Sequence, residues 1–198
     1  MDITLARLTE SNFADYEALT SCEGGGGCYC SFWHQRIASM DEWETRRKTN
    51  PALNRQVVLD KVLTGYHVGV VAYEGGKPAA WISVGPLPEF YWAWRRVAQL
   101  GEDARSTAGI LCVTVGGAHR GRGIQRRALS ALRPYGAAQG WTAIEGYPFD
   151  ASAVAAHGSA VAWTGTTKGF EDAGFSRTGA HWLSRPESER SIWRVDVR

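Results

Sequence analysis

The chain has 198 residues, with 22 Lys and Arg against 20 Asp and Glu, which gives a net charge of +2. This length suits one domain that buries enough surface to fold without disulfides or a structural metal, and a hydrophobic content of 44% excludes a disordered or collagen-like chain. A charge so close to neutral argues against a dedicated nucleic-acid binder, which carries a concentrated basic face.

The hydrophobic periodicity and the turn residues predict elements of both kinds in alternation. The expected strands are 3–8, 66–73, 78–84, 107–115, 141–147 and two near 176–183 and 191–197, and the expected helices are 12–19, 41–49, 52–64, 124–138 and 164–173. A Gly-rich loop at 21–31, a tight turn at 74–77 and an aromatic segment at 90–96 separate them. This order predicts a mixed α/β chain on one sheet, and without a linker or repeat it predicts a single domain over 1–198.

One segment carries recognisable chemistry. The strand at 107–115 runs into a turn rich in glycine and arginine, 116–123, and then into a helix. Glycine lets several backbone N–H groups approach one anion, and the helix adds its positive end. Arg120, Arg122, Arg126 and Arg127 add positive charge there. The spacing is neither a Walker A loop nor a dinucleotide fingerprint, so the residues alone leave a phosphate site and an ordinary βα turn both open.

Val113-Thr114-Val115, followed by Arg120-Gly121-Arg122-Gly123-Ile124-Gln125, resembles motif A of the GCN5-related N-acetyltransferases (GNAT), written Q/R-x-x-G-x-G/A. The chain departs from the motif at Gln125, where glycine or alanine is usual. The resemblance covers nearly the whole chain. It implies a GNAT fold, with one mixed, mostly antiparallel sheet of about seven strands, splayed at the cofactor site and flanked by about four helices.

The resemblance also implies acetyl-CoA as co-substrate. The backbone amides of 120–125 would bind its pyrophosphate, and strand 113–115 would pair with its pantetheine arm. An amide near Val113 or Val115 would polarise the thioester carbonyl, which would lie where this strand and the one carrying Ile144 part. The implied cofactor-binding residues are Val113, Thr114, Val115, Arg120, Gly121, Arg122, Gly123, Ile124 and Gln125.

The activity so implied is transfer of an acetyl group to a primary amine by direct attack in a ternary complex. The acceptor stays open between a small amine, a peptide N-terminus, a lysine and an aminoacyl-tRNA. Two alternatives come from other classes: an acyl-CoA-binding protein with little transferase activity, and an aromatic-lined module that binds a ligand or a protein. Paired subunits are common in the family, so the resemblance allows a homodimer.

The catalytic acid and base are harder to assign. Where the family often has a tyrosine acid, this chain has Phe170, and the motif strand offers no carboxylate. Glu145 and Tyr147 rank first as catalytic residues, because they lie on the strand expected to flank the thioester. A strand-end charge and a packed aromatic are the plain alternatives for these two, and positioning alone could also drive the reaction. The remaining candidates are Asp150, His119 and His157.

Cysteines and aromatic residues are frequent in the part of the chain that precedes the motif. Cys22, Cys28, Cys30 and His34 could supply four zinc ligands, but the spacing matches no common zinc motif, so we expect thiols and no metal. Cys112, on the motif strand, is expected in the core. The aromatic residues expected to line the acceptor side, where an aromatic amine or a cation could bind, are Tyr29, Trp33, Trp81 and Tyr91.

The compartment follows from what the sequence does not contain. Residues 1–13 show no basic region followed by an apolar run, so no secretory signal is expected. No stretch approaches the ~18 consecutive apolar residues of a membrane span. Four cysteines in such a chain indicate reduced thiols in the cytoplasm.

Overall fold

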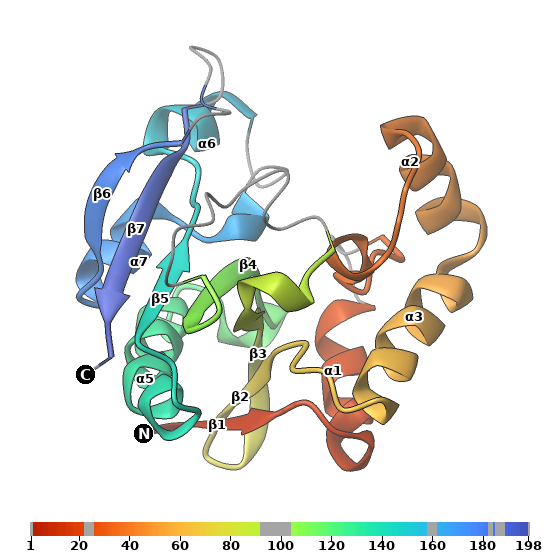
Figure 1. Ribbon diagram of the computed structural model, residues 1–198, viewed down its shortest axis with the longest axis horizontal. Helices are drawn as coiled ribbons and strands as arrows, with labels where there is room; N and C mark the ends of the chain where they lie inside the picture. The colour runs from red at the N-terminus through yellow and green to blue at the C-terminus, as the bar shows by residue number, and fades with distance from the viewer. Residues whose placement is uncertain are drawn as a thin grey trace.

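The computed structural model describes residues 2–21, 26–91, 104–157, 162–181, 184 and 189–197. Within them, seven strands form one sheet in the order β1-β2-β3-β4-β5-β7-β6 (Figure 1). The strands are β1 (Ile3–Arg7), β2 (Val70–Glu74), β3 (Lys77–Pro86), β4 (Thr107–Val115), β5 (Ala143–Gly146), β6 (Ser176–Ala180) and β7 (Ser191–Asp196). All neighbours pair antiparallel except β4 and β5, which pair parallel.

Helices and short 3-10 turns connect the strands. The helices are α1 (Phe13–Thr20), α2 (Met40–Thr49), α3 (Pro51–Leu63), α5 (Ile124–Ala138), α6 (Ala151–His157) and α7 (Thr167–Asp172). The 3-10 turns are η1 (Glu10–Asn12), η2 (Ser31–His34), η3 (Leu87–Glu89), η4 (Gly117–His119) and η6 (Ala162–Thr164). The expected mixed, mostly antiparallel sheet of about seven strands is confirmed, and the described residues form six α-helices where about four were expected.

Local sequence signals explain where several elements begin. Ser39 caps α2 by accepting the Glu42 backbone N–H at 3.1 Å. Asn50 caps α3 in the same way, and Pro51, which has no N–H to lose, is its first residue. The β2–β3 hairpin turns at Gly75 and Gly76, whose φ angles of 57° and 78° are those of a two-residue primed turn.

The structure agrees with the predicted bounds best around the motif. Strand 107–115 and helix 124–138 are β4 and α5. β2 begins four residues later than expected, after Gly69, whose φ of 154° interrupts regular strand geometry. The helix expected from 164 begins only at Thr167, because the Thr166 side chain caps it. Helix α6 was not predicted at all.

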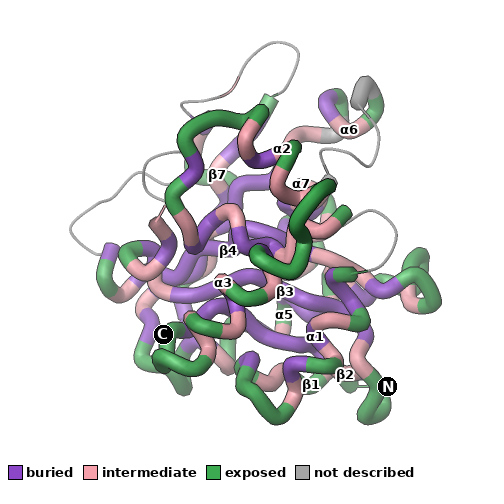
Figure 2. The backbone as a smooth tube through the Cα atoms, turned by 90° about the vertical axis from the view of Figure 1, so that its right-hand side faces the viewer, coloured by how far each residue is buried: buried purple, intermediate pink, exposed green. Residues whose placement is uncertain are grey.

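The sheet is covered on both faces, and the alternation of side chains along its strands decides which residue faces which cover. Val70 and Ile82 join the core cluster that packs on α5, whereas their neighbours Val71 and Trp81 join the cluster under α1 and α3. Figure 2 shows the central strands buried along most of their length and the outer helices exposed. The sheet therefore separates the α5 side from the α1 side, and the two sides receive different parts of the site.

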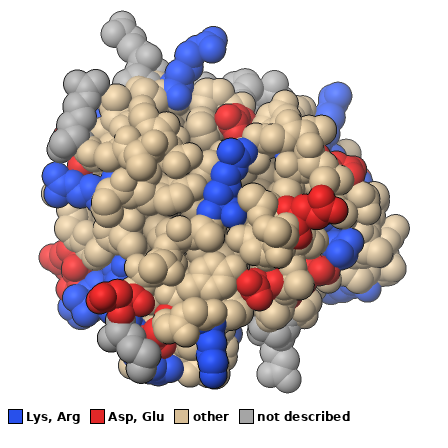
Figure 3. All heavy atoms as spheres, turned by 90° about the horizontal axis from the view of Figure 1, so that it is seen from below, with Lys and Arg blue, Asp and Glu red and all other residues tan. Residues whose placement is uncertain are grey.

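Helix length and the charges on one face of the molecule can be compared, among the described residues, with what a membrane span or a charged patch requires. No helix among the described residues is long and apolar enough to cross a bilayer. On the face shown in Figure 3, basic and acidic side chains are interspersed.

Candidate functional site

The site is built where β4 and β5 part. The two strands pair only from Thr107–Ala143 to Ile110–Gly146, and β5 then ends. β4 continues to Val115, with β3 paired on its other edge throughout. From 111 to 115, the edge of β4 that faces away from β3 therefore has no partner residues from β5. Here η6 packs against β4 (Figure 1).

A β-bulge marks the start of this open edge. Ile110 pairs with Val84 and Cys112 with Ser83, so Leu111 is one extra residue in β4. As a result Leu111 and Cys112, although consecutive, both lie on the α1 side of the sheet, whereas Ile110 and Val113 lie in the core under α5. Bulges of this kind bend a strand and occur often beside active sites.

The turn between β4 and α5 offers backbone donors to an anion. Gly121 and Gly123 have φ angles of 73° and 69°, and a Cβ added at either would meet no atom within 4 Å. Gly123 is the N-cap residue of the 15-residue α5 and supplies no side-chain cap. The first N–H groups of α5 therefore have no acceptor within the helix, and they can donate to a ligand at the partially positive helix N-terminus.

A buried carboxylate holds this turn in place. The Glu74 side chain, 5% exposed at the end of β2, accepts hydrogen bonds from Arg127 at 2.5 Å and His119 at 3.2 Å and forms an ion pair with Arg122 at 2.9 Å. The hydrogen bond from Arg127, together with that from His119 and the positive charge of Arg122, holds the pKa of Glu74 below its usual value. Arg122 is thus engaged on Glu74, while Arg120 is exposed and its Nε lies 3.3 Å from the Val115 carbonyl oxygen.

Two buried polar atoms without partners lie near the open edge of β4. Gln125 places its carboxamide against Gly165 and Gly169, since a Cβ on either glycine would come within 3 Å of its Nε2. That Nε2 atom and the Oγ1 of Thr164 are buried, and neither has a hydrogen-bond partner among the described residues. A buried polar atom without a partner usually marks a place that a ligand or an ordered water satisfies.

The family follows from a comparison of the sequence with known families. Residues 33–158, more than half of the chain, match the model of the acetyltransferase (GNAT) family. The chain belongs to the GNAT acetyltransferases. No curated protein sequence matches it.

Solved structures share the fold of this GNAT chain at low sequence identity. An aminoglycoside acetyltransferase, AAC(6')-Ib, solved with coenzyme A and kanamycin, is 19% identical with a TM-score of 0.61, over 98% of this chain and 95% of that one. The same enzyme with ribostamycin and coenzyme A gives 19% and 0.61, over 99% and 94%. A putative acetyltransferase from Salmonella typhimurium, yncA, solved with acetyl-CoA, is 15% identical with a TM-score of 0.55, over 100% and 95%.

The two catalytic candidates of this GNAT chain contact each other. The Tyr147 hydroxyl donates to Glu145 Oε2 at 2.9 Å, and Arg194, opposite Glu145 on β7, donates to Oε1 at 2.9 Å. Tyr147 is 1% exposed, and burial together with the Glu145 charge raises its pKa well above the usual value. Its phenol therefore stays protonated at neutral pH. Both residues lie on the α1 side of β5.

The other proton-transfer candidates have structural partners. His119 contacts Glu74, and Asp150 accepts from the Ser191 hydroxyl at 2.7 Å. Phe170, at the position where the family often has a tyrosine, is fully buried against Phe175. The side chain of His157 lies outside the described residues. The structure thus joins only Glu145 and Tyr147 into one pair.

The aromatic residues expected on the acceptor side lie at different depths. Trp81 is 1% exposed and packs edge-on against Tyr16, with ring centroids 4.6 Å apart. Trp33 is 5% exposed and shares a cluster with Leu111 and Tyr147. Tyr29 and Tyr91 are half-buried. The expected assignment of these four to an acceptor pocket stays a prediction, and most of segment 90–96 lies outside the described residues.

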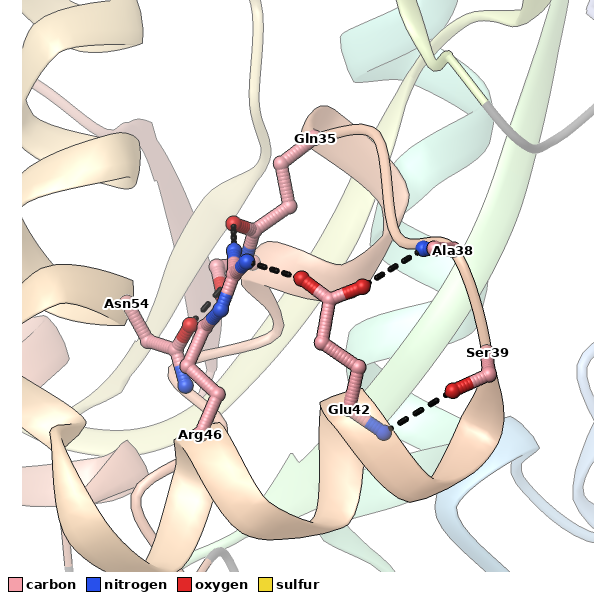
Figure 4. Close-up of polar contacts among 7 residues, drawn as sticks. Gln35, Ala38, Ser39, Glu42, Arg46 and Asn54 are labelled. Atoms are coloured by element: carbon pink, nitrogen blue, oxygen red, sulfur yellow. Dashed lines mark hydrogen bonds and ion pairs between the residues drawn. The ribbon is translucent and has the colours of Figure 1, made fainter.

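A polar network anchors the early loop to the helices. Arg46 donates to Gln35 at 2.5 Å and Gln35 donates to Asn54 at 3.0 Å (Figure 4). Asn54 in turn donates to the Gly27 carbonyl at 2.9 Å. This network joins η2 and the residues before it to α2 and α3. Sequence inspection missed both this network and the role of Glu74, because hydrogen bonds between distant segments leave no local pattern.

Cys28, Cys30 and Cys112 are free thiols, and Cys22 lies outside the described residues. Among the residues that the structure describes, no cluster of three His, Cys, Asp or Glu side chains is arranged to hold a metal ion.

Proposed function

We propose that this chain transfers an acetyl group from acetyl-CoA to a primary amine by direct attack in a ternary complex. The observation that carries the proposal is the open edge of β4, which begins at the Leu111 bulge and leads directly into the glycine turn and the N-terminus of α5. Such an edge can hydrogen-bond the amides of pantetheine, and the turn can bind its diphosphate. The solved neighbours with coenzyme A and amine antibiotics are consistent with this.

The residues present fit acetyl-CoA. Space is open beside Gly121 and Gly123, where a diphosphate would approach the backbone. The unpartnered Oγ1 of Thr164 and Nε2 of Gln125 lie where an amide-bearing arm would run along β4. The proposed cofactor-binding set is therefore the strand 113–115 and the turn 120–125, joined by Thr164.

The proton steps follow from the Glu145–Tyr147 pair. The acceptor nitrogen attacks the thioester carbonyl carbon, the carbon–sulfur bond breaks, and a backbone N–H near Val113 or Val115 stabilises the carbonyl oxygen as charge develops. The acceptor attacks as the neutral amine; we assign Glu145 to take one proton from the ammonium that forms on its nitrogen during attack, and Tyr147 to give its proton to the departing thiolate. Because the two side chains are hydrogen-bonded, the proton on Glu145 then returns to Tyr147, and the pair is restored.

Gly123→Val tests the cofactor site. A β-branched residue is strained at a φ of 69°, so we expect this variant to lose the rise in melting temperature that acetyl-CoA gives the natural chain. Gly140→Val is the matched control, because Gly140 has a φ of 77° and equally open space at the opposite end of α5. The control should keep its response to acetyl-CoA. An unchanged response in Gly123→Val would contradict the proposed site.

The acceptor is found by mass spectrometry. A panel of primary amines that includes aminoglycosides, small aromatic amines and peptides is incubated with acetyl-CoA, and a product heavier by one acetyl group is expected for at least one class. Binding of acetyl-CoA without any acetylated product would favour an acyl-CoA-binding protein over a transferase.

A further inference from the structure

Three thiols lie in a chain of contacts beneath the bulge of β4. The Sγ atoms of Cys30 and Cys112 are 3.0 Å apart, although 82 residues separate them in sequence. Both residues are 7% exposed. The thiol of Cys28, which is only partly buried, is hydrogen-bonded to that of Cys30. This row of three thiols therefore begins at the partly buried Cys28 and ends at Cys112, on the strand that carries the open edge.

The fold holds both ends of this row in place. The bulge at Leu111 turns Cys112 toward the α1 side, where Tyr16 and Trp81 pack around it. On the other side, Tyr29 and Cys30 have φ angles of 49° and 47°, which residues with a Cβ rarely adopt. Such a conformation persists only where the surroundings enforce it, and the Asn54 bond to the Gly27 carbonyl anchors the segment just before these two residues.

The three thiols differ in reactivity. The hydrogen bond from Cys30 lowers the pKa of Cys28, and the positive charge of Arg47 lowers it further. Hydrogen bonding with the neighbouring thiols and burial raise the pKa of Cys30 well above its usual value. Since the thiolate is the nucleophile, Cys28 is the first of the three to meet an oxidant, and Cys30 is the thiol that follows.

We propose that Cys30 and Cys112 form a reversible disulfide, loaded through Cys28 by hydrogen peroxide, that switches off the acetyl-transfer site. Its effect on turnover rests on the proposed function, whereas the formation of the bond does not. Intracellular disulfides that form transiently in this way act as redox sensors.

The steps balance. Cys28 thiolate attacks peroxide, which gives a sulfenic acid and hydroxide. Cys30 then attacks that sulfur, forming a Cys28–Cys30 disulfide and releasing water. Cys112 attacks the sulfur of Cys30, so the disulfide moves to Cys30–Cys112 and Cys28 leaves as a thiol. Overall, two thiols are oxidised by two electrons and one peroxide is reduced to two waters.

The disulfide would act on the site through β4. Bond formation brings the sulfur atoms of Cys30 and Cys112 from 3.0 Å to the disulfide distance of about 2.05 Å. This movement falls at the bulge, the first residues of the open edge. A displacement of this size between reacting groups can slow an enzyme by about 100-fold, which is the loss of turnover that we expect.

Peptide mapping tests the bond directly. Trypsin leaves Cys22, Cys28 and Cys30 on the peptide 8–36, and Cys112 on the peptide 106–120. After peroxide treatment and digestion without reductant, we expect these two peptides to be joined, and to separate with dithiothreitol. Joining should be lost in Cys30→Ser and Cys112→Ser, slowed in Cys28→Ser, and unchanged in the control Cys22→Ser.

Two outcomes would overturn the proposal. Unjoined peptides in the natural chain, with Cys28 oxidised to a sulfinic acid, would refute the disulfide whatever the protein acetylates. Joined peptides with the same acetyl-CoA-dependent turnover before and after reduction would refute the switch. The first readout needs no activity, so its failure is distinguishable from failure of the proposed function.

Discussion

Tyr147 and Glu145 show how one hydrogen bond gives two ordinary side chains complementary tasks. Burial and, after it, the Glu145 carboxylate raise the pKa of the phenol, so Tyr147 keeps a proton that it can give away, and Arg194 orients the carboxylate from the neighbouring strand. The Tyr147 ring also packs edge-on against the His181 ring, with centroids 5.8 Å apart, whereas its hydroxyl is bound to Glu145. The pair therefore carries the proton transfer that we propose.

Tyr147→Phe removes the hydroxyl and keeps the ring in its cluster with Trp33 and Leu111. We expect kcat to fall about 100-fold, since a positioned acid contributes at least that much, and KM for acetyl-CoA to stay unchanged. Steady-state kinetics measure both quantities. Tyr135→Phe, which removes a hydroxyl bound to His67 outside the site, serves as the control. An unchanged kcat in Tyr147→Phe would leave positioning as the main source of catalysis.

Single residues were predictable where chemistry depends on local spacing. Gly121 and Gly123 adopt the positive φ angles that their place in the motif requires. Glu74 gave no signal, because its three basic partners lie 45 to 53 residues away in the chain. Long-range pairing of this kind is visible only once the hairpin and the turn are in contact.

At the scale of elements, α5 and α7 meet through one unusual contact. Gln125, in the first turn of α5, places its carboxamide beside Gly165 and Gly169. A Cβ at residue 169 would lie 2.3 Å from Gln125 Nε2. The glycine of α7 and the glutamine of α5 are therefore complementary.

Gly169→Ala tests this complementarity in two backgrounds. Alanine favours the middle of a helix over glycine by up to about 1 kcal/mol, so in a Gln125→Ala chain the substitution should stabilise the protein by less than that amount, because the new Cβ still lies 3.1 Å from the capping Thr166 Oγ1. In the natural chain the gain should be lost, because the new methyl group meets the carboxamide. Denaturant unfolding of the four variants gives the coupling. Equal effects of Gly169→Ala in both backgrounds would show that the two sites are independent.

Elements with strong periodicity were predicted to the residue, as β4 and α5 show. Helix α6 was missed because it follows the Tyr147–Pro148 turn and is short and rich in small residues, so its sequence lacks an amphipathic period. Its neighbour η6 was also missed, although it packs on β4 at the open edge.

For the whole molecule, acid stability depends on histidines buried in their neutral form. His67 is 7% exposed, with Nδ1 2.9 Å from the Val84 carbonyl oxygen and Nε2 2.7 Å from the Tyr135 hydroxyl. Burial lowers its pKa to about 4, and burial likewise lowers the pKa of His34 to about 3. The unfolded chain therefore takes up protons at a higher pH than the folded protein.

Proton binding to the unfolded chain determines the direction of this pH dependence. The free energy of unfolding is highest above the unfolded histidine pKa of about 6.5. It falls as the pH drops toward the pKa of His67 in the folded protein, because protons bind preferentially to the unfolded chain. His67 alone should lower the free energy of unfolding by about 2 kcal/mol between pH 8 and pH 5. His67→Gln should flatten the pH dependence by that amount in urea titrations. The same slope in both proteins would contradict the assignment.

The bulge at Leu111 places a single inserted amino acid where the opening between β4 and β5 begins, directly after the last β4–β5 pair. A chain that lacked residue 111 would keep Ile110 opposite Val84 and Cys112 opposite Ser83, and every remaining side chain of β4 would stay on its present face. The core under α5 would be unchanged, but the straighter strand would lack the bend with which the open edge begins. Such a chain would also lose the buried Leu111 side chain from its cluster with Trp33 and Tyr147, so one inserted residue serves both the bend of β4 and the packing on the α1 side.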